Sequence, residues 1–244
     1  MRLQLESPQP ISKSAEKMRL LKTLQCTTKY EKAAWAAGAG RVAGVDEVGR
    51  GSLFGPVVAA AVVLDPGYRI RGLRDSKLLP EARREALAQR ILEHCLGWAT
   101  AAVDAARIDE INIYQASRLA MLMAVRQLEP APDHLLIDAL TIDYECAQTP
   151  IVHGDALSAS IAAASIVAKV ERDRLLREWD PVFPAYGLAA NKGYCTRKHV
   201  AALREYGPSP LHRRSFAPVW LAASPQPALA FMLEDEVETA GKPG

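Results

Sequence analysis

One stretch near the start of the chain, AGVDEVGRGSLFGPVVAAAVVL at residues 43–64, restricts the fold more than any other. It opens with a short apolar segment that reaches Asp46 and Glu47, passes through a glycine-rich loop, and continues as an apolar run over 57–64. A continuous apolar run of this length, opened by Pro56, predicts a buried strand. We expect it to pair with the strand that ends at Asp46, so that two acids stand beside the loop.

The remaining patterns predict an α/β fold. Three antiparallel strands followed by alternating helices and strands indicate a mixed five-stranded sheet flanked by helices. Two of the later strands are expected to end in an acid, HLLID at Asp138 and PIVHGD at Asp155. The other expected elements are a strand over 97–104 and helices over 80–95, 114–128 and 156–179.

Charge and apolar patterning limit the class of protein. The longest apolar run has eight residues, far below the roughly 20 of a membrane span, and the N-terminus lacks the apolar core of a signal peptide. Four cysteines without a CxxC pair are typical of reduced thiols, so we expect a cytoplasmic protein with no membrane partner. Residues 41–168 hold 12 basic and 16 acidic side chains, whereas 169–214 hold 10 basic and 5 acidic ones. Such a division suits a protein that binds cations with one part and a polyanion with the other.

Four carboxylates, Asp46, Glu47, Asp138 and Asp155, are the candidate catalytic and metal-binding residues. If they converge at one edge of the sheet, each close pair repels by roughly 4 kcal/mol at an effective dielectric constant of 20. Oxygen ligands without histidine or cysteine favour Mg²⁺ or Mn²⁺, and two such ions would form a site for phosphodiester hydrolysis.

Each acid also has a structural interpretation. Asp46 fits a turn, Asp138 a solvated strand end, and Asp155 a helix N-cap. Neighbouring strand residues face opposite sides of a sheet, so Asp46 and Glu47 share a site only if the strand ends or twists there.

The loop GRGSLFGP must be tested as a phosphate loop. The spacing of Gly49, Gly51 and Gly55 does not match GxGxxG, and the chain has neither a P-loop nor a GxSxG elbow. What remains is close approach of a ligand to the backbone, which suits a sugar–phosphate chain; a plain hairpin turn is the alternative.

Several motifs together resemble the type 2 ribonucleases H, and specifically the ribonuclease HII family. They cover residues 41–219 in order: GVDEVGRGSLFGPVV, LRDSKLL, IDEIN, LLID, GDALSASIAAASIVAKVERDR, NKGYCT and HRRSFAPV. The resemblance implies a ribonuclease H-like fold with a C-terminal helical extension. It indicates a catalytic domain (41–180) and a helical substrate-binding part (181–224). Outside the match, a charged stretch over 12–37 without internal Gly or Pro predicts an N-terminal helical extension (1–40), and a tail with Pro, Gly and four acids predicts disorder over 225–244.

The resemblance also implies a function and a set of site residues. The expected enzyme is a metal-dependent endonuclease that cuts the RNA strand of RNA–DNA hybrids, and cuts 5′ of ribonucleotides embedded in duplex DNA. It would leave 5′-phosphate and 3′-hydroxyl ends and serve ribonucleotide excision and primer removal. The family's metal ligands fall on the four carboxylates, and its substrate-reading residues on Gly49, Arg50, Gly51 and Tyr194.

Other residues are expected to contact substrate phosphates. Lys77 is a candidate, with a structural ion pair as the equal alternative, and the basic residues of 192–214 are candidates with a solvated surface as the alternative. These basic residues are Lys192, Arg197, Lys198, Arg204, Arg213 and Arg214. His212 is predicted to be structural. The chain departs from the family at Ala139 and Cys195, where glycine is common.

Two rival functions remain from the residues alone, a hybrid-binding module that does not cut and an integrase-like nuclease on the same fold. We expect a monomer. The segment QPALAFML at 226–233 resembles sliding-clamp peptides weakly, with an unstructured tail as the preferred interpretation.

Overall fold

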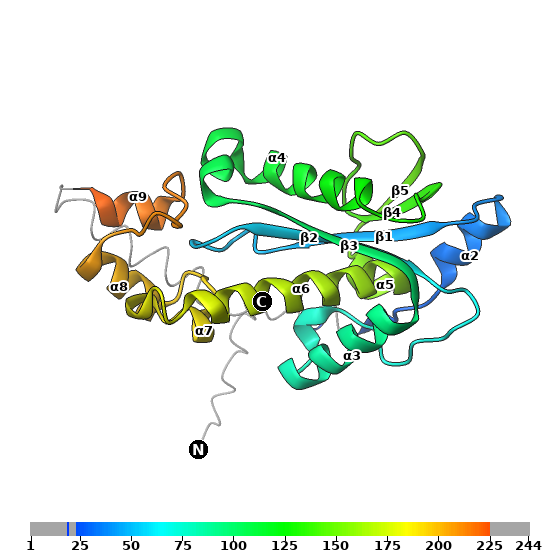
Figure 1. The fold of residues 1–244 in the computed structure, drawn as a ribbon, viewed down its shortest axis with the longest axis horizontal. Helices are drawn as coiled ribbons and strands as arrows, with labels where there is room; N and C mark the ends of the chain where they lie inside the picture. The colour runs from blue at the N-terminus through cyan, green and yellow to red at the C-terminus, as the bar shows by residue number, and fades with distance from the viewer. Residues whose placement is uncertain (1–18, 20–22, 225–244) are drawn as a thin grey trace, which may run out of the picture.

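The computed structural model describes residue 19 and residues 23–224. Its fold is a five-stranded sheet with helices on both faces and a helical C-terminal part beyond one end (Figure 1). The strands are β1 (Val42–Val48), β2 (Val57–Leu64), β3 (Cys95–Val103), β4 (His134–Asp138) and β5 (Ala147–Ile151). The α-helices are α2 (Lys29–Ala36), α3 (Glu81–His94), α4 (Ala105–Arg126), α5 (Gly154–Leu157), α6 (Ala159–Trp179), α7 (Leu188–Asn191), α8 (Arg197–Tyr206) and α9 (Ala217–Ala223).

The sheet has the order β3-β2-β1-β4-β5. Strand β2 is antiparallel to both β1 and β3, whereas β1 and β4, and β4 and β5, are parallel. The predicted mixed five-stranded α/β sheet is therefore confirmed. Strand β1 lies in the centre, so the acids near its end stand in the middle of the sheet and not at an exposed side.

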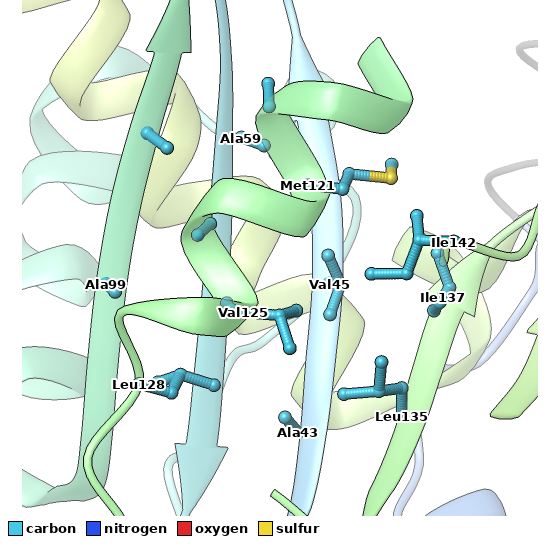
Figure 2. Close-up of a cluster of buried hydrophobic side chains, with 14 of the residues drawn as sticks. Ala43, Val45, Ala59, Ala99, Met121, Val125, Leu128, Leu135, Ile137 and Ile142 are labelled. Carbon is cyan, nitrogen blue, oxygen red and sulfur yellow. The ribbon is translucent and has the colours of Figure 1, made fainter. Parts of the chain in front are cut away.

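Helix α4 covers one face of the sheet, and α3 and α6 cover the other (Figure 1). Small and branched side chains from β1, β2 and β4 meet α4 in a closely packed cluster that includes Val45, Met121 and Ile137 (Figure 2). All three are shielded from solvent. The alternation of side chains along β1 then assigns its neighbouring residues, Gly44 and Asp46, to the face that α6 covers.

Gly44 lets α6 approach the centre of the sheet. A Cβ atom at this position would lie 2.0 Å from the carbonyl carbon of Ser160. No side chain fits there, so the first turn of α6 rests directly on β1. This contact fixes the start of α6 relative to the acidic end of β1.

The predicted strand over PIVHGD is wrong beyond Ile151. Strand β5 ends there, and Asp155 lies in the short helix α5 rather than at a strand end. The cause is His153, whose φ of 58° is left-handed and turns the chain out of the sheet. The helix expected over 156–179 is likewise divided into α5 and α6.

Helix α4 begins nine residues before the predicted start at 114. Its first turn is capped by Asp104, whose carboxylate accepts from the N–H of Arg107 at 2.8 Å. Asn112 is non-helical and caps the second part by accepting from the N–H of Gln115 at 3.1 Å. The apolar pattern predicted only the second part, because the first part is short and ends at the non-helical Asn112.

Within the described residues, no helix is both long enough and apolar enough to cross a lipid bilayer. The predicted disordered tail and the clamp-like segment at 226–233 lie outside the described residues. The same holds for most of residues 1–22, so α2 represents the expected N-terminal helical extension here.

Candidate active site

Asp46 and Asp138 stand on neighbouring parallel strands. The register pairs Val45 of β1 with Ile137 of β4, which brings the next residue of each strand together on the α6 face. Asp46 is only 5% exposed. Burial, followed by the charges of the neighbouring acids Glu47, Asp138 and Asp155, raises the pKa of Asp46 well above its ordinary value.

Glu47 follows Asp46 within β1, because the strand continues to Val48. Ideal alternation would direct the two side chains to opposite faces, but Glu47 and Val48 are only partly buried where the strand ends, so alternation alone does not separate the two acids. They still interact electrostatically near the strand end. Burial raises the pKa of Glu47, the nearby Arg50 lowers it, and the charge of Asp138 raises it further. One Glu47 oxygen lies 3.4 Å from a guanidinium nitrogen of Arg50.

Asp155 reaches the same group from α5. Burial, the charge of Asp75 and the charge of Asp138 raise its pKa to about 6, although Lys77 opposes the shift. The Nζ atom of Lys77 lies 3.8 Å from Asp155 Oδ2. Asp138 is connected to α5 by the N–H of Gly154, which donates to Asp138 Oδ1 at 2.8 Å. The interpretation of Asp155 as an α6 N-cap is wrong, because Ser158 occupies that position.

The four carboxylates carry more negative charge than their surroundings neutralise. Arg50 and Lys77 contact the group, which leaves two charges uncompensated when all four acids are ionised. The pKa of each acid is raised, in every case chiefly by burial, and the charges of neighbouring acids add to the shift. In the part of the chain that the structure describes, no three acids already surround a common point as ligands of one ion.

The donor set nevertheless fits hard divalent cations. All four side chains offer carboxylate oxygens, and the raised pKa values mean that added positive charge would stabilise their ionised forms. Binding would replace the contacts of Glu47 with Arg50 and of Asp155 with Lys77. Both partners are on flexible side chains that are about half exposed, so they can move aside.

The glycine loop and Tyr194 lie next to each other, although they are far apart in the sequence. Ser52 forms an antiparallel bridge with Tyr194, and the N–H of Leu53 donates to the carbonyl of Gly193 at 2.8 Å. Arg50 and Gly51 are exposed. A Cβ atom on Gly51 would meet nothing within 4 Å, so its backbone is open to a ligand.

Arg172 of α6 joins these two segments and was missed by the sequence analysis. Its buried guanidinium donates to the carbonyls of Pro56 (3.1 Å), Phe54 (3.1 Å) and Lys192 (2.9 Å), and to Ser52 Oγ (2.7 Å). The guanidinium carbon also lies 5.7 Å from the centre of the Tyr194 ring.

The helical spacing contained the signal for this role. Arg172 is four residues after Ala168 and four before Leu176, and both of these are fully buried. The position of Arg172 on the buried stripe therefore indicated an internal arginine.

Gly49 is required by the same arginine. Its φ is 93°, and a Cβ atom there would lie 2.1 Å from Arg172 Nε. The glycine loop is thus closed over a buried cation, which explains one of its glycines without any ligand.

The prediction that Arg213 contacts substrate phosphates is wrong. Its side chain is fully buried and donates to the carbonyls of Gly55 at 2.9 Å and Arg50 at 2.8 Å. It supports the glycine loop from inside. Lys192 is mostly buried and lies 3.6 Å from Glu81, while Arg197 and Lys198 are exposed at the start of α8.

His212 is structural, as predicted. Its Nδ1 accepts from the N–H of Ser209 at 3.0 Å, so its proton lies on Nε2, which is 3.0 Å from His199 Nε2. His199 must then carry its proton on Nδ1 and donate to the carbonyl of Tyr194 at 2.9 Å. Burial, and secondly the charge of His199, lowers the pKa of His212 to about 3. His212 is therefore neutral at physiological pH.

The sheet order, the flanking helices and the acids on its central strands are those of ribonuclease H-like nucleases. The family model described as Ribonuclease HII matches residues 43–219. The chain therefore belongs to the ribonuclease HII family, and it is a nuclease that hydrolyses phosphodiester bonds.

Named relatives agree over most of the chain. A ribonuclease HII of Koribacter versatilis (strain Ellin345) is 68% identical over 234 residues, which cover 96% of this chain and 92% of the relative. A ribonuclease HII of Solibacter usitatus (strain Ellin6076) is 55% identical over 195 residues, 80% of this chain and 86% of the relative.

Solved structures share the fold. Ribonuclease H2 from Pyrococcus horikoshii OT3 has a TM-score of 0.65 and 26% identity, covering 75% of this chain and 97% of its own. The ribonuclease HII in the PCNA:RNase HII complex from Archaeoglobus fulgidus has a TM-score of 0.61 and 24% identity, covering 77% and 98%. Bst-RNase HIII in complex with Mn²⁺ has a TM-score of 0.58 and 20% identity, covering 88% and 83%.

Proposed function

We propose that this chain is a metal-dependent endonuclease that cuts the RNA strand of RNA–DNA hybrids and cuts 5′ of ribonucleotides embedded in duplex DNA. The proposal depends on one observation: the acids of the neighbouring strands β1 and β4 lie beside the glycine loop and the Tyr194 segment. Asp46 and Asp138 are brought together by the β1–β4 register, and the loop that follows β1 is bonded to the Tyr194 segment. Family membership supports a ribonuclease, and the name ribonuclease H supports the hybrid substrate.

We assign the binding of Mg²⁺ or Mn²⁺ to Asp46, Glu47, Asp138 and Asp155. When bound, two such ions supply an activated water and stabilise the charge on the leaving 3′-oxygen. The related fold of Bst-RNase HIII in complex with Mn²⁺ is consistent with this choice of ion. Products would carry 5′-phosphate and 3′-hydroxyl ends.

The protein's own residues would position the substrate. The backbone at Gly49 and Gly51 and the side chain of Arg50 would contact the ribonucleotide, whose 2′-hydroxyl distinguishes RNA from DNA. Tyr194 is half-buried beside this loop and would pack against the sugar at the junction. Lys77, which lies 3.8 Å from Asp155 Oδ2, would exchange this ion pair for a substrate phosphate.

The proposal is tested with a DNA duplex that holds one ribonucleotide, incubated with and without Mn²⁺ beside an all-DNA control. Cleavage at the ribonucleotide that requires Mn²⁺ is expected. Metal-independent binding without cleavage would favour a hybrid-binding module, and cleavage of the all-DNA duplex would favour an integrase-like nuclease.

The variant Asp138→Asn isolates the role of the acids. We expect it to abolish cleavage and to leave hybrid binding intact, because the change removes a charge without altering shape. Lost binding together with retained cleavage of bound substrate would contradict the assignment. Binding should also weaken steeply as salt increases if the exposed Arg197 and Lys198 neutralise phosphates.

We also propose a sliding clamp as a partner. One structural neighbour is the ribonuclease HII of a PCNA complex, and residues 226–233 of this chain resemble clamp-binding peptides weakly. Deletion of 225–244 is expected to remove clamp-stimulated activity. Unchanged stimulation would dismiss this partner.

A further inference from the structure

The segment before β1 is attached to the connection between α5 and α6. Thr27 forms a parallel bridge with Ser158, in which its N–H donates to the carbonyl of Leu157 at 3.0 Å. The N–H of Ala159 returns a bond to the carbonyl of Thr27, also at 3.0 Å. Two backbone bonds thus hold this segment beside the residues that follow Asp155, and α2 lies at the α5 end of the molecule (Figure 1).

Glu31 adds a buried charge to this attachment. It projects from α2 and is only 1% exposed. One of its oxygens, Oε1, accepts from the hydroxyl of Ser158 at 2.6 Å and from the N–H of Ser160 at 2.8 Å. A carboxylate at this position also complements the positive end of the α6 dipole.

Ser158 connects Glu31 to both helices of the acidic site. Its hydroxyl caps α6 by accepting from the N–H of Ile161 at 3.2 Å. Its own N–H donates to the carbonyl of Gly154 at 2.8 Å and closes the turn that contains Asp155. A shift of Ser158 would therefore move the backbone of Asp155 with it.

We propose that residues 23–36 form a brace that positions Asp155, and that Glu31 is its positioning residue. Glu31 acts through Ser158 and contacts neither substrate nor metal. The brace lies before residues 43–219, which the family model matches. The inference rests on the proposed function only where it concerns the role of Asp155 in metal binding.

The alternative is that Glu31 stabilises the fold and nothing more. In that case its loss would lower the melting temperature and leave the acidic site unchanged below that temperature. The two interpretations separate on measurements made well below melting, because a brace affects local order and ligand geometry in the folded protein.

The main variant is Glu31→Ala in the full chain, with Lys32→Ala as the matched control on the exposed side of α2. Hydrogen exchange of the metal-free protein is measured for residues 154–161, and Mn²⁺ affinity is measured by titration calorimetry. We expect Glu31→Ala to lose exchange protection over 154–161 and to bind Mn²⁺ about tenfold more weakly, the low end of the range for outer ligand-supporting residues. Lys32→Ala should match the wild type in both measurements.

Two further variants keep the test decisive. Glu31→Gln retains an acceptor oxygen for Ser158 and Ser160, so it should restore most of the exchange protection. Ser158→Ala removes the hydroxyl that both contacts Glu31 and caps α6, and it leaves α2 unchanged, so it replaces Glu31→Ala if that variant does not fold. A folded Glu31→Ala or Ser158→Ala protein with wild-type Mn²⁺ affinity and wild-type protection over 154–161 would overturn the brace.

Asp155→Asn separates failure of the brace from failure of the proposed function. If it weakens Mn²⁺ binding and Glu31→Ala does not, the brace is wrong and the metal assignment stands. If Asp155→Asn leaves Mn²⁺ binding unchanged, the metal assignment is wrong, and exchange protection over 154–161 alone decides the brace.

Discussion

Replacement of Asp155 by asparagine should stabilise the metal-free protein while it damages the enzyme. The pKa of Asp155 is raised from 3.8 to about 6 in the folded protein, chiefly by burial. A raised acid pKa means that the folded state holds its proton more tightly than the unfolded state, so stability falls as pH rises between these two values. The penalty is absent below about pH 4 and complete above about pH 6.

The magnitude follows from the same shift. A difference of about two pKa units corresponds to about 3 kcal/mol, at about 1.36 kcal/mol per unit. The favourable charge of Lys77 is already contained in this shift, so its loss is not subtracted again. The net gain at pH 8 is then about 3 kcal/mol, which raises the melting temperature by about 6–12 °C in a chain of this length.

The assay is thermal unfolding in EDTA from pH 4 to pH 8.5, with Asp143→Asn as the control at an exposed acid. Asp155→Asn should melt at a higher temperature than the wild type at pH 8, and this difference should disappear near pH 4. The control should have the melting temperature of the wild type at every pH. Saturating Mn²⁺ should reverse the order, because a ligand stabilises the protein that binds it. An asparagine variant that is less stable than the wild type in EDTA at pH 8, or a difference independent of pH, would refute the reasoning.

Three further substitutions test the packing around the site by denaturant unfolding. Arg172→Met should destabilise the protein by about 3–5 kcal/mol, since four buried acceptors lose their donor, and Arg172→Lys should recover part of this loss. Equal stability of Arg172→Met and the wild type would mean that these hydrogen bonds do not stabilise the loops. Gly44→Ala should cost about 3 kcal/mol or more, because its methyl group would overlap the Ser160 backbone, and a loss under about 1 kcal/mol would mean that α6 can shift freely. Ala139→Gly should stabilise by about 1 kcal/mol, since φ at this residue is 58°, with Ala156→Gly in α5 as a control that should destabilise.

Local patterns were sufficient for much of this architecture. The apolar run over 57–64 predicted β2 with its bounds, and HLLID predicted β4 and the strand-terminal place of Asp138. Both segments are buried by helices on either face, so their apolar runs match their burial directly. The motifs that resemble ribonuclease HII then indicated the four acids as one group, which spacing alone could not do.

Other features depend on contacts that a linear pattern does not contain. Asp155 was assigned to a strand end because nothing in PIVHGD indicates that His153 turns the chain at a positive φ. Arg213 looked like a surface cation, although its partners are carbonyls of the glycine loop more than 150 residues earlier. The contact between Glu31 and Ser158 spans 127 residues, so no periodicity could reveal it.

The guanidinium of Arg172 holds two loops that are distant in the sequence, 49–56 and 192–195, in a fixed relative position. The carbonyls of Phe54 and Pro56 and that of Lys192 converge on a single planar group, so neither loop can change its path without releasing a bond held by the other. Loops transplanted between ribonucleases of this family should accordingly work as a matched set, with residues 49–56 and 192–195 exchanged together. A chimera that imports only one of the two loops would no longer present carbonyl groups from both loops to the same guanidinium, so the two loops would lose their fixed relative position.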